Sequence, residues 1–224
     1  MTHDALVIKG GKPLAGEIVL KGAKNFIPKA LVAALLTSDT CKLHDVPHIQ
    51  DTQIVEDIFK LMNVGFSFVG SDSVEISAKK IKNPDAIGFC DMSGKSRIPI
   101  LMCAPLLHRN KRALVPELGG CNIGSRPVDF HIKALKKMGA KLVKEGEYTY
   151  LQIEDRLHGA DIHLDYPSVG ATEQIIFASV LAEGKTELTN AAVEPEILDL
   201  IGMLQKMGAN IRFKDTRHIT IEGV

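Results

Sequence analysis

The sequence predicts an α/β fold in which three repeated units form an inside-out barrel. Three segments, spaced roughly 70 residues apart, show an amphipathic helical pattern that ends in Met followed closely by Gly. A different helical segment, apolar on nearly all sides, precedes each of them, and short strands of alternating polarity follow. A helix that is apolar all round is normally buried on every side. We therefore expect the three apolar helices to pack at the centre, with sheets and amphipathic helices outside.

The amphipathic helices are expected within segments 52–68, 126–143 and 194–213. In the last of these, Ile197, Ile201 and Leu204 lie at positions i, i+4 and i+7, which places them on one face of a helix. Pro195 suits the first helical position. The far ends carry glycines that suit a left-handed helix cap: Gly65, Gly139 and Gly208.

The apolar helices are expected at 24–36, 96–107 and 171–182. A strand and a turn should precede each of them, at 17–23, 87–95 and 162–170, and a strand should follow, at 40–46, 112–118 and 186–191. Strands of alternating polarity should close the units, at 73–78, 148–154 and 218–223. A doubly wound open sheet is the alternative fold. The strands alternate in polarity more than the strands of a parallel sheet covered on both faces, which argues against it.

The composition argues against several classes of protein. The 224 residues carry no net charge, no Trp and only 5% aromatic residues, so a nucleic-acid partner is not expected. The apolar runs are too short to span a bilayer, and the first residues lack the pattern of a signal peptide. The four cysteines lie in unrelated contexts, which does not indicate a disulfide framework. We expect a cytoplasmic protein that does not insert into membranes.

Threefold packing would bring the N-termini of the three apolar helices to one end of the domain. A helix N-terminus offers free amide donors and a partial positive charge, so it favours anions. The turns that lead into these helices add cationic side chains, those of Lys21, Lys24, Lys95 and Arg97. This set predicts a site for phosphate, diphosphate or carboxylate groups. The alternative for any single residue is a solvated surface side chain.

A glycine-rich loop at 119–124 carries Cys121, five residues before Arg126. A thiol near helix amides and arginines has its thiolate favoured and is therefore reactive. The glycines allow the loop unusual backbone angles. On these grounds alone, Cys121 is either a catalytic thiol or a small residue packed under a turn.

Cys41, His44 and His48 have a spacing that some zinc sites use. Zinc requires about four ligands in a tetrahedron, and no second pair lies nearby in the sequence. We therefore predict no metal site.

Five stretches together resemble the enolpyruvyl transferase family, in particular its bacterial members that act on UDP-N-acetylglucosamine. They are KGAKN at 21–25, Arg97 before an apolar helix, GGCNIGSRPVDFHI at 119–132, DYPSVGAT at 165–172 and NAAVEPEI at 190–197. The family has two inside-out barrels with the active site between them, so the resemblance implies that this chain is one of two domains. Residues 1–20 would be a strand that pairs with the second domain, and residues 21–224 would form the barrel that bears the catalytic loop. The second barrel is absent from this chain.

The resemblance implies transfer of the enolpyruvyl group of phosphoenolpyruvate to the 3-hydroxyl of UDP-N-acetylglucosamine, with release of phosphate. This is the first committed step of peptidoglycan synthesis, and it needs no cofactor. The expected partners are the two small-molecule substrates and the missing second domain. In the family, the aspartate that deprotonates the sugar hydroxyl belongs to that domain, so we expect the 224-residue chain alone to have little or no activity. The alternative is a non-catalytic or degenerate module that binds a nucleotide sugar and acts through partner proteins.

The resemblance also implies a role for each matching residue. Cys121 would protonate the methylene carbon of phosphoenolpyruvate, form the covalent phospholactoyl adduct and react with fosfomycin. Lys24 and Arg126 would hold the phosphate and carboxylate of phosphoenolpyruvate, with Asn25 beside the sugar. Arg97 would contact the nucleotide sugar. The uracil would lie against Arg126, Pro127, Val128, Asp129 and Phe130, and the diphosphate region against Tyr166, Pro167, Ser168 and Val169.

Overall fold

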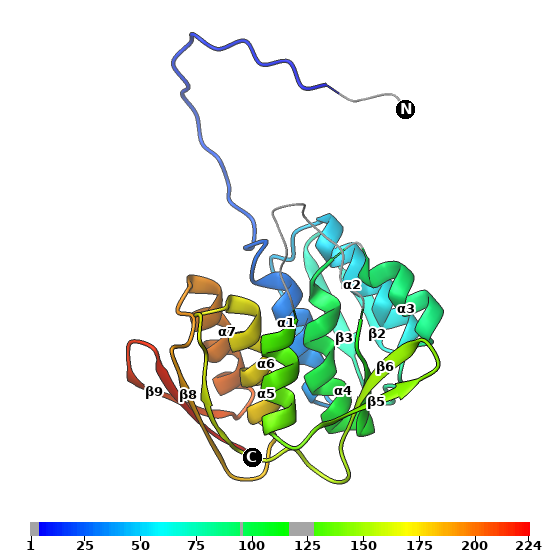
Figure 1. Cartoon of the computed structure of the whole chain (residues 1–224). Coiled ribbons are helices and arrows are strands. Elements are labelled where there is room, and N and C mark those ends of the chain that lie inside the picture. The colour runs from blue at the N-terminus through cyan, green and yellow to red at the C-terminus, as the bar shows by residue number, and fades with distance from the viewer. Residues whose placement is uncertain (1–4, 95, 117–127) are drawn as a thin grey trace.

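The computed structural model describes residues 5–94, 96–116 and 128–224. In this part of the chain, helices lie between three separate sheets. In Figure 1, strands β8 and β9 lie on one side of helices α4, α5 and α6, and strands β5 and β6 lie on the other. Three separate and mostly antiparallel sheets exclude the doubly wound open sheet over this part of the chain.

The first unit begins with the buried helix α1, which continues as the 3-10 turn η1. Its elements are α1 Ile27–Ala33, η1 Ala34–Leu36, β1 Thr40–Leu43, α2 Gln50–Leu61, β2 Gly65–Val69 and β3 Ser73–Ser77. The strands form one antiparallel sheet in the order β1-β3-β2.

The second unit has its buried helix in two parts, the 3-10 helix η2 and the α-helix α4. Its elements are α3 Ala86–Ser93, η2 Ile98–Met102, α4 Cys103–Asn110, β4 Arg112–Leu114, α5 Asp129–Lys137, β5 Lys141–Glu145 and β6 Tyr148–Gln152. Its sheet is again antiparallel, in the order β4-β6-β5.

The third unit adds one strand before its buried helix α6. Its elements are β7 Asp161–His163, α6 Val169–Ser179, β8 Lys185–Thr189, α7 Pro195–Lys206, β9 Asn210–Asp215 and β10 His218–Glu222. The sheet order is β7-β8-β10-β9, with β7 parallel to β8 and the other pairs antiparallel.

The strand pairing repeats from unit to unit. In each sheet the strand that follows the buried helix pairs with the second strand of the later hairpin, and its first residue faces the last residue of that strand. The three facing pairs are Thr40 with Ser77, Arg112 with Gln152 and Lys185 with Glu222. A register shift of one residue would turn every side chain of a strand to the other face of its sheet, so this shared register places the same faces toward the helices.

The three apolar segments are helices that contact one another, as predicted. The tandem η2–α4 contacts both other buried helices, because α4 packs on α6 and η1 while η2 packs on α1 and α6. Leu31 of α1, Leu106 of α4 and Phe177 of α6 are completely buried. Of the amphipathic helices, α2 packs on α1, α5 packs on α6, and α7 packs on both. Burial of apolar surface in this central group is the main source of folding free energy.

The strand predicted at 87–95 is wrong, because the described part of this segment forms helix α3. The side chain of Asp85 accepts a hydrogen bond from the backbone N–H of Gly88 at 2.8 Å, which caps the helix N-terminus. The helix buries Phe89 completely. The N-terminal cap and the burial of Phe89 therefore favour a helix over the strand that the composition of this segment predicted.

The strand predicted at 17–23 is also absent from this structure. Residues 5–20 form no strand and are exposed, and they extend away from the body in Figure 1. Their large apolar side chains face solvent: Leu6, Val7, Ile8, Leu14, Ile18, Val19 and Leu20. A strand requires a hydrogen-bonding neighbour, and no other segment of the described chain pairs with these residues. Pairing of residues 1–20 with a second domain stays a prediction.

Two of the three glycine caps are confirmed. Gly139 and Gly208 follow α5 and α7 with φ of +104° and +106°. After α2 the left-handed residue is Asn63 with φ of +57°, and Gly65 instead starts β2. Asn tolerates this conformation better than most residues, so the prediction of Gly65 as the cap was wrong by two positions.

Replacing Gly208 with Ala should lower the free energy of unfolding by about 1–2 kcal/mol, because a Cβ is strained at positive φ. The space around Gly208 is open, so no side-chain clash contributes. Asn63→Gly should change the free energy by less than about 1 kcal/mol, since glycine relieves the same strain but removes the hydrogen bond from Asn63 to the Lys80 carbonyl. Urea unfolding of both variants measures this difference, and equal losses would contradict it.

Candidate functional site

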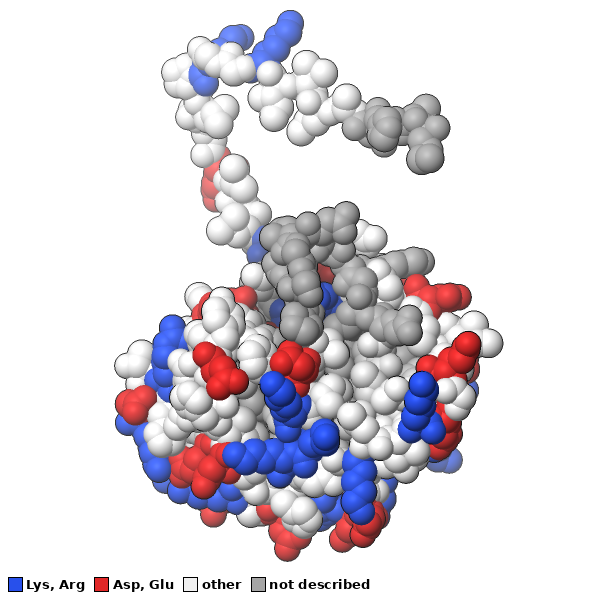
Figure 2. Space-filling model, viewed as in Figure 1, with Lys and Arg blue, Asp and Glu red and all other residues white. Residues whose placement is uncertain are grey.

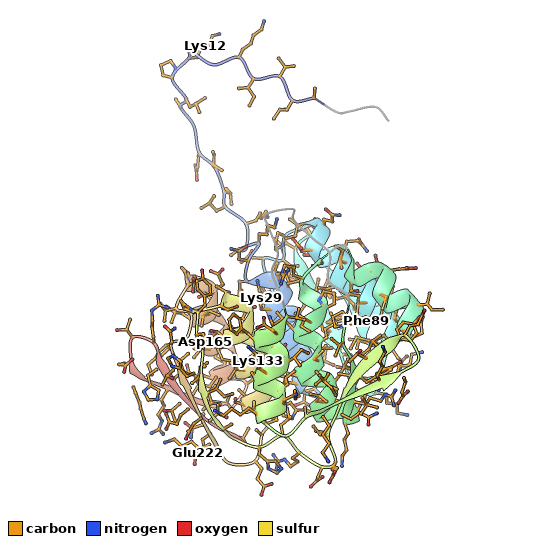
Figure 3. The ribbon with its side chains drawn as sticks, viewed as in Figure 1. Lys12, Lys29, Phe89, Lys133, Asp165 and Glu222 are labelled. Atoms are coloured by element: carbon orange, nitrogen blue, oxygen red, sulfur yellow. The ribbon has the colours of Figure 1, made fainter. Side chains whose placement is uncertain are left out.

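A pocket of about 670 Å³ opens where the three buried helices begin. Lys29 of α1, Arg97 and Ile98 at the start of η2, and residues 168–170 at the start of α6 all line it. Figure 3 labels Lys29 on α1 and Asp165 in the segment that leads into α6. The helix N-termini therefore meet at one site, as the sequence predicted. The other lining residues are Ile100, Leu101, Phe130, His131, Tyr166, Pro167, Glu173 and Glu194.

The start of α6 gives the pocket its clearest anion-binding feature. Ser168 is the N-cap residue, and its hydroxyl accepts a hydrogen bond from the backbone N–H of Ala171 at 3.3 Å. The remaining amides of the first turn have no partner within the helix, and the helix dipole adds a partial positive charge. Together they favour a phosphate or diphosphate group.

Arg97 lies at the start of the second buried helix. It occupies the N-cap position of η2, where the hydroxyl of Ser96 accepts a hydrogen bond from the backbone N–H of Ile98 at 3.2 Å. Pro99 in the first turn of η2 suits a helix start. This local structure fixes the backbone of Arg97 at the mouth of the pocket.

The structure brings together six of the residues predicted from the sequence. They are Arg97, Phe130, Tyr166, Pro167, Ser168 and Val169. Four others are described but do not line this pocket: Lys24, Asn25, Val128 and Asp129. Cys121, Arg126 and Pro127 lie outside the described residues, as does Lys95.

Lys24 and Asn25 lie just before α1 and contact residues in the first turns of α2 and α7. The Lys24 ammonium is 3.7 Å from a carboxylate oxygen of Asp51 on α2, and its side chain is largely exposed. The side-chain amide of Asn25 donates to a carboxylate oxygen of Glu196 on α7 at 3.2 Å. The Lys29 ammonium donates to the backbone carbonyl of Asn25 at 2.6 Å, which ties this turn to the wall of the pocket.

Two charged residues that line the pocket, Lys29 and Glu173, were not predicted from the sequence. Lys29 Nζ lies 3.6 Å from Glu173 Oε1, with side chains that are 13% and 2% exposed. Burial, together with Glu196 and Glu194, raises the pKa of Glu173 to about 7, and Lys29 opposes that rise. Both residues are charged positions in helices that are otherwise apolar, which was the available signal in the sequence.

His131 of α5, which from the sequence could be a surface residue or one behind the site, is buried and lines the pocket. It is 5% exposed, and its Nδ1 is buried with no hydrogen-bond partner. Burial lowers its pKa to about 4, and the charge of Arg97 acts in the same direction, against a hydrogen bond with Gln174 and the charge of Asp129. A Cβ at position 170 would lie 3.2 Å from Cε1 of His131, so Gly170 permits the close approach of α6 to this imidazole.

Among the described residues, no group of three or more His, Cys, Asp or Glu side chains is placed to hold a metal ion. Of the candidate zinc residues, His44 Nδ1 bonds the hydroxyl of Ser73 at 3.0 Å, and His48 Nε2 bonds the carbonyl of Ser71 at 2.8 Å.

Burial raises the pKa of the Cys103 thiol to about 12, so this thiol is unreactive. The described chain also has no helix of the length and hydropathy needed to cross a bilayer.

A second hollow is lined by residues of α5, β7, β8, β9 and β10, and it differs in that the carboxylate of Glu187 is paired with neighbouring side chains. The carboxylate of Glu187 accepts hydrogen bonds from Lys214 at 3.0 Å, His218 at 2.7 Å and Thr220 at 2.9 Å. On the face shown in Figure 2, acidic and basic side chains are likewise intermixed. The pocket at the helix starts is therefore the better candidate for an anionic ligand.

Comparisons with known proteins identify the family of this chain. The family described as EPSP synthase (3-phosphoshikimate 1-carboxyvinyltransferase) matches residues 8–224. UDP-N-acetylglucosamine 1-carboxyvinyltransferase 1 of Staphylococcus aureus strain N315 is 42% identical over 223 residues, which cover 99% of this chain and 52% of that protein. UDP-N-acetylglucosamine 1-carboxyvinyltransferase of Endomicrobium trichonymphae is 43% identical over 228 residues, with the same coverage. The chain therefore spans about half the length of the curated relatives it matches.

Solved structures show the same fold at low sequence identity. The enolpyruvyl transferase NikO from Streptomyces tendae superposes with a TM-score of 0.80 at 20% identity, covering 96% of this chain and 50% of that one. An EPSP synthase structure from Acinetobacter baumannii gives a TM-score of 0.74 at 19% identity, covering 93% and 47%. The fold of this chain is thus the mixed α/β fold of one half of an enolpyruvyl transferase.

The buried imidazole makes a testable contribution to stability. Since the pKa of His131 is about 4 in the folded chain and 6.5 ordinarily, the unfolded chain binds the extra proton between these values. Stability from neutral His131 is present above pH 6.5 and is lost as the pH falls through 4. Between pH 7 and pH 4, the free energy of unfolding of the native chain should fall by about 2–3 kcal/mol more than that of His131→Asn. Urea unfolding at both pH values measures this loss, and parallel pH profiles would contradict it.

Proposed function

Since the chain belongs to the EPSP synthase (3-phosphoshikimate 1-carboxyvinyltransferase) family, we propose that it carries half of the active site of an enolpyruvyl transferase that acts on UDP-N-acetylglucosamine. The observation that carries this proposal is the meeting of three buried-helix starts, with Arg97 and Lys29, at one pocket. An anionic nucleotide sugar matches such a site. Identities of 42% and 43% over 99% of the chain support this sugar substrate.

In the proposed reaction, the enolpyruvyl group passes from phosphoenolpyruvate to the 3-hydroxyl of the sugar. The oxygen of that hydroxyl bonds to C2 of phosphoenolpyruvate while C3 gains a proton, which gives a tetrahedral intermediate. Loss of a proton from C3 and cleavage of the bond from C2 to the phosphate oxygen then release phosphate, and in the net reaction the hydroxyl proton leaves with the phosphate. This reaction begins peptidoglycan synthesis in the cytoplasm. It requires fixed cations near the phosphate and carboxylate groups, since charge is concentrated on both in the tetrahedral intermediate.

The proposal assigns parts of the ligand to parts of the pocket. The first turn of α6, with Tyr166, Pro167, Ser168 and Val169, would bind the diphosphate through backbone amides. Arg97 would contact the nucleotide sugar, and Phe130 would form a wall beside the uracil. These assignments are supported by the shared lining of one pocket. Lys24, Asn25, Cys121, Arg126, Pro127, Val128 and Asp129 would complete the site in the roles that the family resemblance implies.

We also propose that the three units form an inside-out barrel in residues 21–224. The shared strand register and the mutual contacts of the three buried helices support this arrangement. A second domain would supply the rest of the active site, since the chain spans only 52% of its curated relatives. The exposed apolar side chains of residues 5–20 support a partner strand in that domain, because a row of such side chains is costly in water.

Fosfomycin labelling tests the enzyme against a non-catalytic binding module. The chain, incubated with fosfomycin and UDP-N-acetylglucosamine, should gain the mass of one fosfomycin at Cys121, and Cys121→Ser should gain none. Labelling is expected because nearby cationic groups favour the thiolate of Cys121 and so make it reactive. Intact mass and peptide mapping measure the addition.

A chain that remains unlabelled should be retested with the second half of a homologous enzyme supplied separately. Labelling in that sample alone shows that the second domain completes the site. Absence of labelling in both samples contradicts the catalytic proposal and favours the binding module.

A further inference from the structure

Glu173 is an unexpected residue in a pocket that favours anions. Among the described residues, it is the one buried Asp, Glu, Lys or Arg, with 1% of its surface exposed. It lies on α6, one turn after the N-cap residue Ser168, and it lines the same pocket as Arg97. A buried carboxylate here opposes the positive potential of the helix start.

The surroundings of Glu173 do not fully compensate its charge. Its Oε1 has no hydrogen-bond partner, and its cationic neighbour Lys29 is 3.6 Å away and donates to the Asn25 carbonyl instead. From α7, the carboxylates of Glu194 and Glu196 face it and add repulsion. From the other helices, Arg97 and His131 line the same pocket. A carboxylate placed in this way is close to balance between its charged and neutral forms.

We propose that Glu173 takes up a proton from solvent when a nucleotide diphosphate enters the pocket, which leaves the charge of Lys29 free to act on the ligand. This inference rests on the proposed function. The incoming diphosphate is a like charge in a partly buried site, and like charges disfavour the ionised carboxyl. The only chemical change in the protein is conversion of the carboxylate to a carboxylic acid.

Glu173 is better placed for this role than the other titratable groups of the pocket. Its pKa of about 7 means that a modest rise protonates it at neutral pH. The pKa of His131 is about 4, so a much larger rise would be needed there. Glu194 is exposed, and Glu196 already accepts a hydrogen bond from Asn25. Solvent screening weakens the effect of a ligand on an exposed carboxylate.

Isothermal titration calorimetry of the full chain with UDP-N-acetylglucosamine measures this proton directly. The titration is run at pH 7 in buffers that differ in ionisation enthalpy, because the slope of the binding enthalpy against that quantity is the number of protons taken up. The native chain should take up roughly half a proton per ligand, since a group whose pKa equals the pH is half protonated before binding. Glu173→Gln should take up none. Glu147→Gln, the control at an exposed carboxylate that does not line the pocket, should keep the native value.

The outcomes separate this inference from the proposed function. Binding without proton uptake, or the same uptake in Glu173→Gln, overturns the role of Glu173 and leaves the proposed function intact. Failure of the native chain and both variants to bind overturns the proposed function and the inference with it.

A second measurement on the native chain does not depend on a variant that folds. Carboxyl NMR should show the pKa of Glu173 rising by at least about one unit when the ligand is added. A Glu173 titration curve that stays in place with ligand bound overturns the inference.

Discussion

The structure depends on the mutual burial of three apolar helices. Because α1 with η1, η2 with α4, and α6 have no polar face to turn toward water, each must be covered by neighbouring helices, and α4 and α6 are also covered by the sheets. This packing leaves only their ends accessible, and the starts of all three line one pocket. At the start of α6, first-turn backbone amides have no partner within the helix, which is the physical basis for binding an anion there.

The same constraint explains where uncompensated charge is found. On the sheets, charged groups pair with one another, as Glu187 does with Lys214 and His218. At the helix starts, Glu173 and His131 are buried with unpartnered polar atoms. Such groups cost folding free energy, and two buried titratable groups of this kind at one pocket are typical of a functional site. At the Lys29–Glu173 pair, the proposed proton uptake by Glu173 accompanies the binding of the ligand.

Helix positions and burial could be predicted from the sequence because they follow from the period of apolar residues. The errors came from helix capping and from backbone conformation, which do not depend on the spacing of apolar residues. Asp85 caps a helix where a strand was predicted, and Asn63 adopts the left-handed conformation expected of Gly65. At the site, Ser168 and Arg97 could be found from turns and family motifs. Lys29 and Glu173 stood out in the sequence only as charged positions in apolar helices. Neither they nor His131 could be placed at the site, since only the packing of α1, α5 and α6 turns them toward one pocket.

Backbone amide NMR during titration with UDP-N-acetylglucosamine tests the central claim most directly, because it reports which helix starts meet the ligand. The account predicts the largest chemical-shift changes at the first turn of α6, Val169 to Ala171, and at Ile98 beside Arg97. Largest changes around Glu187 and Lys214, with none at these helix starts, would contradict it.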